Sequence, residues 1–91
     1  MSFEQVRGHR VHVQQMGDGD RIVVFVHGMI MDNLASWFFT LAPAVSKRAR
    51  VILYDLRGHG RSERPETGYT VPELVTDLDA LLDVLDVDRP V

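Results

Sequence analysis

The stretch Ile22-Val23-Val24-Phe25-Val26-His27-Gly28-Met29 joins a continuous apolar run to a His-Gly pair. Apolar, largely β-branched residues without polar interruption are typical of a central strand that is covered on both faces. Because this strand should stop abruptly at Gly28, free backbone N–H groups are expected at the carboxyl edge of a sheet. Open α/β folds place their ligands at that edge, and N–H groups there can stabilise an oxyanion. The stretch therefore predicts half of an active site.

Three further segments supply the rest of the expected sheet. Residues 3–7 and 9–15 alternate polar and apolar side chains on either side of Gly8, which predicts an antiparallel hairpin. Residues 50–54 form a second continuous apolar run and predict a second central strand.

The order of these elements fixes the expected topology. A hairpin followed by strand, helix, strand and helix implies that the two apolar strands are parallel and joined by a right-handed crossover. Their carboxyl ends, at His27 and Asp55, should then lie side by side. The loops 28–33 and 56–65 should therefore flank one crevice.

A helical pattern also lies between the two apolar strands. Its apolar residues have helical spacing and are interrupted by Pro43: Leu34, Trp37, Phe38, Leu41 and Val45. Because proline inside a helix costs about 3 kcal/mol, we expect a turn through residues 36–40 and a short helix that begins near Ala42.

The second helix has a clear start. Thr70-Val71-Pro72-Glu73 is a capping box with proline in the first turn. One apolar stripe follows, made of Leu74, Leu78, Leu81, Leu82 and Leu85, and the opposite face carries Asp77, Asp79, Asp83 and Asp86. We expect the acidic face to be solvated surface. Arg89-Pro90 should end the helix, and Val91 should open the next strand.

Size and charge exclude several classes of function. The 91 residues suffice for one domain at most, and 10 basic against 13 acidic residues give a net charge of −3 without a basic stripe, so nucleic acid is not an expected partner. The chain has no cysteine and no apolar run near the roughly 18 residues of a membrane span. We expect a cytoplasmic protein without membrane contact. His9 and His12 have no partners at metal-ligand spacing, so no metal and no cofactor is expected.

Taken together, the motifs resemble the α/β-hydrolase superfamily. The resemblance depends on His27-Gly28, on Trp37 at the start of the following helix, and on the block Asp55-Leu56-Arg57-Gly58-His59-Gly60-Arg61-Ser62 after the next strand. It implies the amino-terminal part of a hydrolase sheet, in which residues 1–91 form one portion of a single domain. The family uses a nucleophile on a strand-to-helix elbow, then an acid, then a histidine. No Gly-x-Ser-x-Gly elbow occurs in these residues, so all three groups, and the remainder of the domain, are expected outside this chain.

The resemblance also assigns residues. It implies that the backbone N–H of Met29 is one oxyanion-hole donor and that Gly28, Ile30 and Met31 form pocket wall. Trp37 is a further wall candidate, although aromatic residues at helical spacing usually pack in the core. Structural roles are implied for His27, Asp55, Arg57, Gly58, His59, Gly60 and Ser62.

The residues of the second loop leave two other questions open. Asp55 should pair with Arg57 or with loop N–H groups, whereas a local relay of His59, Asp55 and Ser62 is disfavoured within one tight loop. A phosphate cradle is also disfavoured, because Gly58-x-Gly60 lacks the third glycine and opens no helix.

Two classes of function remain. The first is a hydrolase that acts on a small ester, thioester, lactone or related carbonyl substrate through a serine nucleophile. On the same fold, an aspartate nucleophile would hydrolyse epoxides or haloalkanes, and cofactor-free lyases, oxygenases or haloperoxidases are further alternatives. The second class is a non-catalytic binding module. In either case, we expect the 91 residues to be inactive by themselves, and the pattern leaves the oligomeric state open.

Overall fold

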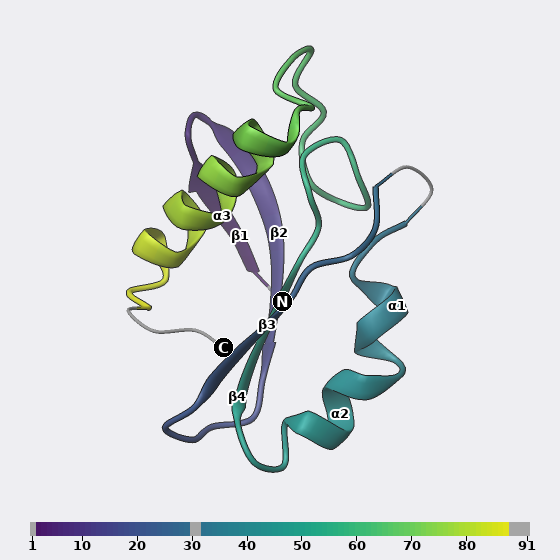
Figure 1. Cartoon of the computed structure of the whole chain (residues 1–91), viewed down its shortest axis with the longest axis vertical. Helices are drawn as coiled ribbons and strands as arrows, with labels where there is room; N and C mark the ends of the chain where they lie inside the picture. Colours follow the sequence, from purple (N-terminus) through teal and green to yellow (C-terminus); the bar gives the residue numbers. More distant parts are fainter. Residues whose placement is uncertain (1, 30–31, 88–91) are drawn as a thin grey trace.

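The computed structural model describes residues 2–29 and 32–87, which form a four-stranded mixed sheet with helices on both faces (Figure 1). In chain order the elements are β1 (Ser2–Val6), β2 (His9–Met16), β3 (Ile22–Phe25), α1 (Ala35–Phe38), α2 (Leu41–Val45), β4 (Arg50–Tyr54) and α3 (Val71–Val84). The expected hairpin, both apolar strands and the crossover helices are confirmed. The expected helix end is wrong, because α3 ends at Val84, five residues before Arg89, and Asp86 follows with a positive φ of 59°. Val91 and the pair Arg89-Pro90 themselves lie outside the described residues.

The hairpin turn has the backbone that tight hairpins prefer. Val6 pairs with His9, and the two residues between them, Arg7 and Gly8, both have positive φ, at 51° and 83°. Two consecutive positive φ values define the type I′ geometry whose twist matches the flanking strands. A Cβ added to Gly8 would meet no heavy atom within 4 Å.

The sheet has the order β1-β2-β4-β3, with β3 parallel to β4 and the hairpin antiparallel to it. Central β4 is covered on both faces, and its last four residues are buried. Within the described residues β3 pairs only with β4, so its four residues are half-buried. The continuous apolar run therefore predicts burial that β3 does not have in this chain.

The alternation along β4 divides the core into two layers. Val51 and Leu53 face α1 and α2, where they pack with Leu34 and Ala42. On the other face, the main cluster contains Ile52 and Tyr54 of β4, Val11 and Val13 of β2, and Leu81 of α3.

The first crossover differs slightly from the expected turn. Residues 35–38 form one helical turn, α1, and α2 begins at Leu41, close to the expected Ala42. Pro43 is the third residue of α2, where its missing N–H removes no helical hydrogen bond.

Helix α3 begins as predicted. The Thr70 hydroxyl accepts a hydrogen bond from the Glu73 N–H, and proline occupies the first turn. Leu81 is fully buried, whereas the rest of the leucine stripe is half-buried against the main cluster. No described helix is long and apolar enough to cross a membrane.

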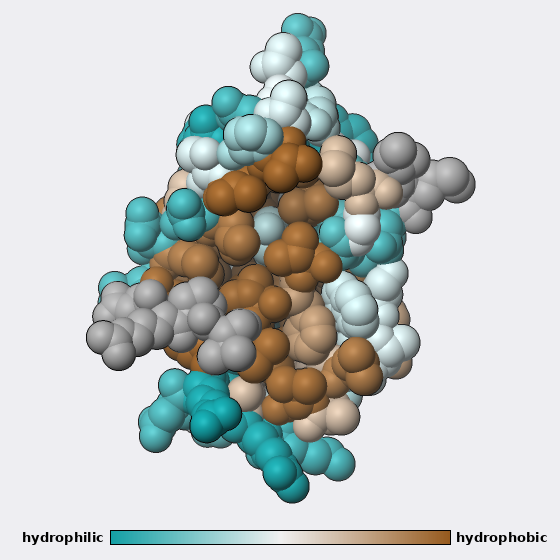
Figure 2. Space-filling model, in the orientation of Figure 1, coloured by the Kyte–Doolittle hydropathy of each residue, from teal (hydrophilic) through white to brown (hydrophobic). Residues whose placement is uncertain are grey.

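Apolar side chains also reach the surface. Figure 2 shows them gathered over the middle of the view in which Figure 1 places β3. Large apolar side chains that are about half exposed include Val26 after β3 and Val75 and Val84 on α3. The face that carries the edge strand is therefore only partly covered by the described residues.

Candidate active site

His27 joins the two loops at the carboxyl edge of the sheet. Its ring is 4% exposed, and Nε2 accepts a hydrogen bond of 3.0 Å from the Leu56 N–H. Nδ1 lies 2.6 Å from the Gly28 carbonyl oxygen, which can only accept. The two partners together fix the neutral tautomer with hydrogen on Nδ1. Both ring nitrogens are thus occupied by backbone, as the predicted structural role requires.

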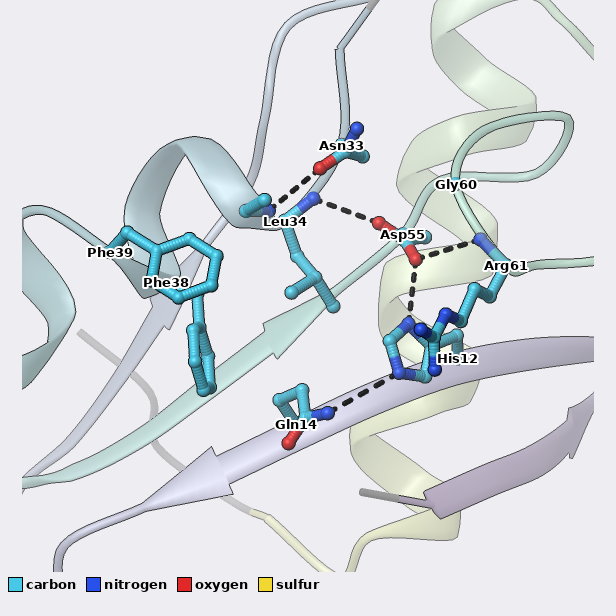
Figure 3. A pocket seen from close by; sticks show the side chains of 10 residues that line it. His12, Gln14, Asn33, Leu34, Phe38, Phe39, Asp55, Gly60 and Arg61 are labelled. Carbon is cyan, nitrogen blue, oxygen red and sulfur yellow. Dashed lines mark hydrogen bonds and ion pairs between the residues drawn. The ribbon is translucent and has the colours of Figure 1, made fainter.

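Asp55 holds three segments through one carboxylate, which is 2% exposed. Oδ1 accepts from the Leu34 N–H at 2.8 Å, and Oδ2 accepts from the Arg61 N–H at 3.0 Å. Oδ2 also lies 2.7 Å from Nδ1 of His12 on β2 (Figure 3). Of the two pairings expected for Asp55, the one with loop N–H groups is correct, and the one with Arg57 is wrong.

The loop after β4 folds closely around this carboxylate. Gly60 has φ of 51°, and a Cβ there would lie 2.3 Å from Cγ of Asp55, so the position requires glycine. The Ser62 hydroxyl is buried, donates to the Asp55 carbonyl at 2.6 Å and accepts from the His12 N–H at 2.9 Å. The Gly58 N–H closes the loop on the Glu63 carbonyl at 2.9 Å.

His59 takes no part in a local relay. Its Nδ1 lies 2.8 Å from the Arg57 carbonyl oxygen, and its ring packs against His27 with centroids 5.1 Å apart. Because Asp55 pairs with His12, and the Ser62 hydroxyl bonds to backbone, the three residues of the disfavoured triad do not form the required chain of contacts.

The acidic face of α3 contains one exception to the prediction. Asp79, Asp83 and Asp86 are exposed as expected, but Asp77 is 4% exposed. Its carboxylate receives two hydrogen bonds of 2.7 Å from Arg57 and one of 3.0 Å from Arg7. The prediction of a solvated Asp77 is wrong because two arginines from distant segments compensate its burial.

The electrostatics of Asp77 follow from these contacts. Burial acts to raise its pKa, but the hydrogen bonds from Arg57 and Arg7 outweigh burial and hold the pKa below the ordinary value of 3.8. Arg57 also donates to the Thr67 carbonyl at 2.7 Å. The Arg57–Asp77 ion pair therefore fastens the loop after β4 to helix α3.

Gly28 and Met29 lie at the start of the other loop. The Gly28 N–H donates to Oδ2 of Asp32 at 2.8 Å, and the Met29 side chain is 45% exposed. Asp32 also accepts from the Ser36 hydroxyl and from the Asn33 N–H, and these bonds lower its pKa. Ile30 and Met31 lie outside the described residues. Asp32 was not among the predicted site residues, although an Asp-Asn pair before a helix is a known capping signal.

Trp37 packs against the sheet. Its ring lies 5.4 Å from that of Phe25, and Nε1 donates to the Val26 carbonyl at 3.2 Å. The indole thus supports the strand end from the α1 side, as the core alternative predicts, and its role as pocket wall stays a prediction.

A cavity of about 380 Å³ lies on the α1 side of the Asp55 carboxylate (Figure 3). Its wall contains polar groups of β2 and the loop after β4, and apolar groups of α1, among them His12, Gln14, Leu34, Phe38 and Arg61. Gly28, Met29 and Trp37 do not line it. Among residues 2–29 and 32–87, no cluster of three His, Cys, Asp or Glu side chains could hold a metal ion.

Comparison with known proteins gives consistent matches. A family model described as the alpha/beta hydrolase fold matches residues 21–91. An uncharacterised protein of Mycobacterium tuberculosis is 36% identical over 89 residues, which are 98% of this chain and 25% of that protein. The structure of an epoxide hydrolase from Vigna radiata has a TM-score of 0.85 at 35% identity, over 98% of this chain and 29% of its own. The structure of an enol-lactonase from Burkholderia xenovorans LB400 has a TM-score of 0.83 at 33% identity. The match covers 98% of this chain and 35% of the enol-lactonase.

The chain belongs to the α/β-hydrolase family. This confirms the family resemblance that the His-Gly and Asp-x-x-Gly-His-Gly-x-Ser motifs indicated. The chain spans between a quarter and about a third of the length of these relatives, at 25%, 29% and 35%. Relatives named for epoxide and lactone chemistry both match, so the family alone leaves the substrate class open.

Proposed function

We propose that the complete protein hydrolyses an ester, thioester, lactone or related small carbonyl substrate through a serine nucleophile. In this proposal, the present segment contributes the Met29 N–H as one oxyanion-hole donor and the residues around it as pocket wall. The supporting observation is the position of Gly28 and Met29 at the carboxyl end of β3, directly beside the loop after β4 to which His27 is bonded.

The chemistry explains why a backbone donor belongs at this position. Attack on a carbonyl places negative charge on the former carbonyl oxygen, and a preorganised N–H stabilises that charge without reorganisation. Removal of one such donor typically costs about 2.7–4 kcal/mol of transition-state stabilisation. His27 and Asp55 would keep the loop in place, while the nucleophile, acid and base would come from residues outside this chain.

The similarity to an epoxide hydrolase favours a second candidate. Epoxide opening would use an aspartate nucleophile and would form an ester intermediate, which water then hydrolyses. The oxyanion donor would serve the second step in the same way. The two candidates therefore differ in the nucleophile rather than in the part of the fold described here.

Labelling of the complete protein separates the candidates. A fluorophosphonate probe should react with a serine nucleophile, and the same preparation should hydrolyse p-nitrophenyl acetate or a simple lactone. Turnover of styrene oxide without fluorophosphonate labelling would favour the aspartate candidate. Absence of labelling and of turnover on all three substrates would contradict both and favour a binding module.

A further inference from the structure

We propose that His12 is a positioning residue for the loop that carries Met29, and that it acts through Asp55; this inference rests on the proposed function. His12 belongs to β2, outside both sequence motifs. Its imidazole is 4% exposed and lies 2.7 Å from the Asp55 carboxylate (Figure 3).

The hydrogen bonds determine which way the imidazole is held. A carboxylate can only accept, so hydrogen lies on Nδ1 of His12. Nε2 lies 3.4 Å from Nε2 of Gln14, whose amide N–H can donate to it. The ring also packs on Phe3 at 5.3 Å between centroids. Ring orientation is therefore set from three directions, and Nδ1–H points at Asp55.

Asp55 transmits this contact to the neighbouring loop. Oδ2 is occupied by the His12 and Arg61 donors, which leaves Oδ1 directed at the Leu34 N–H at 2.8 Å. Leu34 ends the loop after β3 and begins the first turn of α1. Without His12, the carboxylate loses a hydrogen-bond donor on one oxygen and can rotate, so the end of the loop loses its anchor.

A small shift of this loop should lower kcat rather than weaken substrate binding. A preorganised donor works only at the distance set for the developing oxyanion, and a displacement of about 1 Å can cost about 100-fold in rate. Ground-state binding through apolar wall contacts is less sensitive to such a shift. The expected signature is a fall in kcat with a nearly constant KM.

Two amide variants and one apolar variant test the contact in the complete protein. His12→Asn keeps a donor near the position of Nδ1, His12→Gln moves the donor toward the position of Nε2, and His12→Leu removes it. We expect a fall in kcat of about 10- to 100-fold in His12→Leu with KM within about twofold, and a similar fall in His12→Gln. His12→Asn should recover most of the activity. If His12→Leu fails to fold, the comparison between Asn and Gln still decides.

His9 provides a matched control. It lies on the same strand and has the same 4% exposure, and among the described residues Nε2 has no hydrogen-bond partner. Its side chain belongs to the opposite face of the sheet, near Asp77 at 3.9 Å, and does not contact Asp55. His9→Leu should therefore keep kcat within about twofold of the parent. Thermal unfolding of every variant separates loss of fold from loss of position.

Amide hydrogen exchange tests the contact independently of any reaction. Exchange at the Leu34 and Arg61 amides should accelerate in His12→Leu and His12→Gln but not in His12→Asn or His9→Leu. Unchanged exchange at Leu34 in a folded His12→Leu protein would overturn the proposal, as would equal kcat values for His12→Asn and His12→Gln. Accelerated exchange in a protein that turns over no substrate would refute the proposed function and support the anchoring contact alone.

Discussion

Replacement of Gly60 by alanine should be among the most destabilising single changes in this segment. The new Cβ would lie 2.3 Å from both Cγ and Oδ2 of Asp55 and 2.5 Å from Oδ1, and real Cβ atoms do not approach so closely. Asp55 is fully buried and bonded on both oxygens, so it has no free direction in which to move.

The magnitude follows from two contributions. An L-residue at φ of 51° carries a left-handed backbone penalty of about 1–2 kcal/mol. Displacement of Asp55 also breaks at least one hydrogen bond to a charged group, which is worth about 1.5–3 kcal/mol. The sum is about 2.5–5 kcal/mol of unfolding free energy.

Gly8→Ala is the matched control. Gly8 also has positive φ, at 83°, but a Cβ there meets no heavy atom within 4 Å. Only the backbone penalty of about 1–2 kcal/mol remains. Urea unfolding of the complete protein should therefore show Gly60→Ala less stable than Gly8→Ala by about 1.5–3 kcal/mol. If the unfolding free energies of the two variants differ by less than about 1 kcal/mol, then close packing against Asp55 does not explain why position 60 is glycine.

Three other predictions concern charge, catalysis and assembly. Asp77→Asn should cost about 3–5 kcal/mol at neutral pH, because it leaves the buried Arg57 without its carboxylate partner. Since the folded-state pKa of Asp77 is below 3.8, its contribution to stability is complete above about pH 4 and is lost as pH falls further. The unfolding midpoint measured against pH should therefore lose this acid-dependent part in Asp77→Asn. An unchanged dependence of the midpoint on pH would contradict the pairing. Gly28→Val, whose Cβ would crowd Oδ2 of Asp32 at 3.2 Å, should lower kcat about 100-fold, whereas Met29→Ala should change kcat only a few-fold; equal losses would refute the backbone-donor assignment. The 91 residues alone should turn over no p-nitrophenyl acetate and should associate through the open edge of β3; a monodisperse 10.3 kDa species by light scattering would contradict the association.

Local signals account for the parts of the fold that the sequence predicted well. The hairpin depends on a two-residue turn, the start of α3 depends on Thr70 and Glu73, and β4 depends on a short apolar run. Each of these signals lies within a few residues of the structure that it determines. The one-turn helix α1 was missed because its side chains support either a turn or a helix, and packing against the sheet decides.

The contacts of the candidate site could not be read in the same way. Asp77 has the same helical surroundings as Asp79 and Asp83, and only the approach of Arg57 and Arg7 makes its burial possible. The contact of His12 with Asp55 could not be predicted, because nothing near His12 in the sequence indicates Asp55. The motif predicted where Asp55 lies, but the fold determines which groups reach it.

The wide separation of the Asp55 partners has a consequence for the order of folding. Its donors come from residues 43, 21 and 6 positions away along the chain. The most distant contact requires β2 and β4 to be already paired, and loop-closure entropy delays such long-range contacts relative to the hairpin and α3. We therefore expect the carboxylate to acquire its full set of bonds after the rate-limiting step. Substitutions at Asp55 should then accelerate unfolding while leaving the folding rate nearly unchanged.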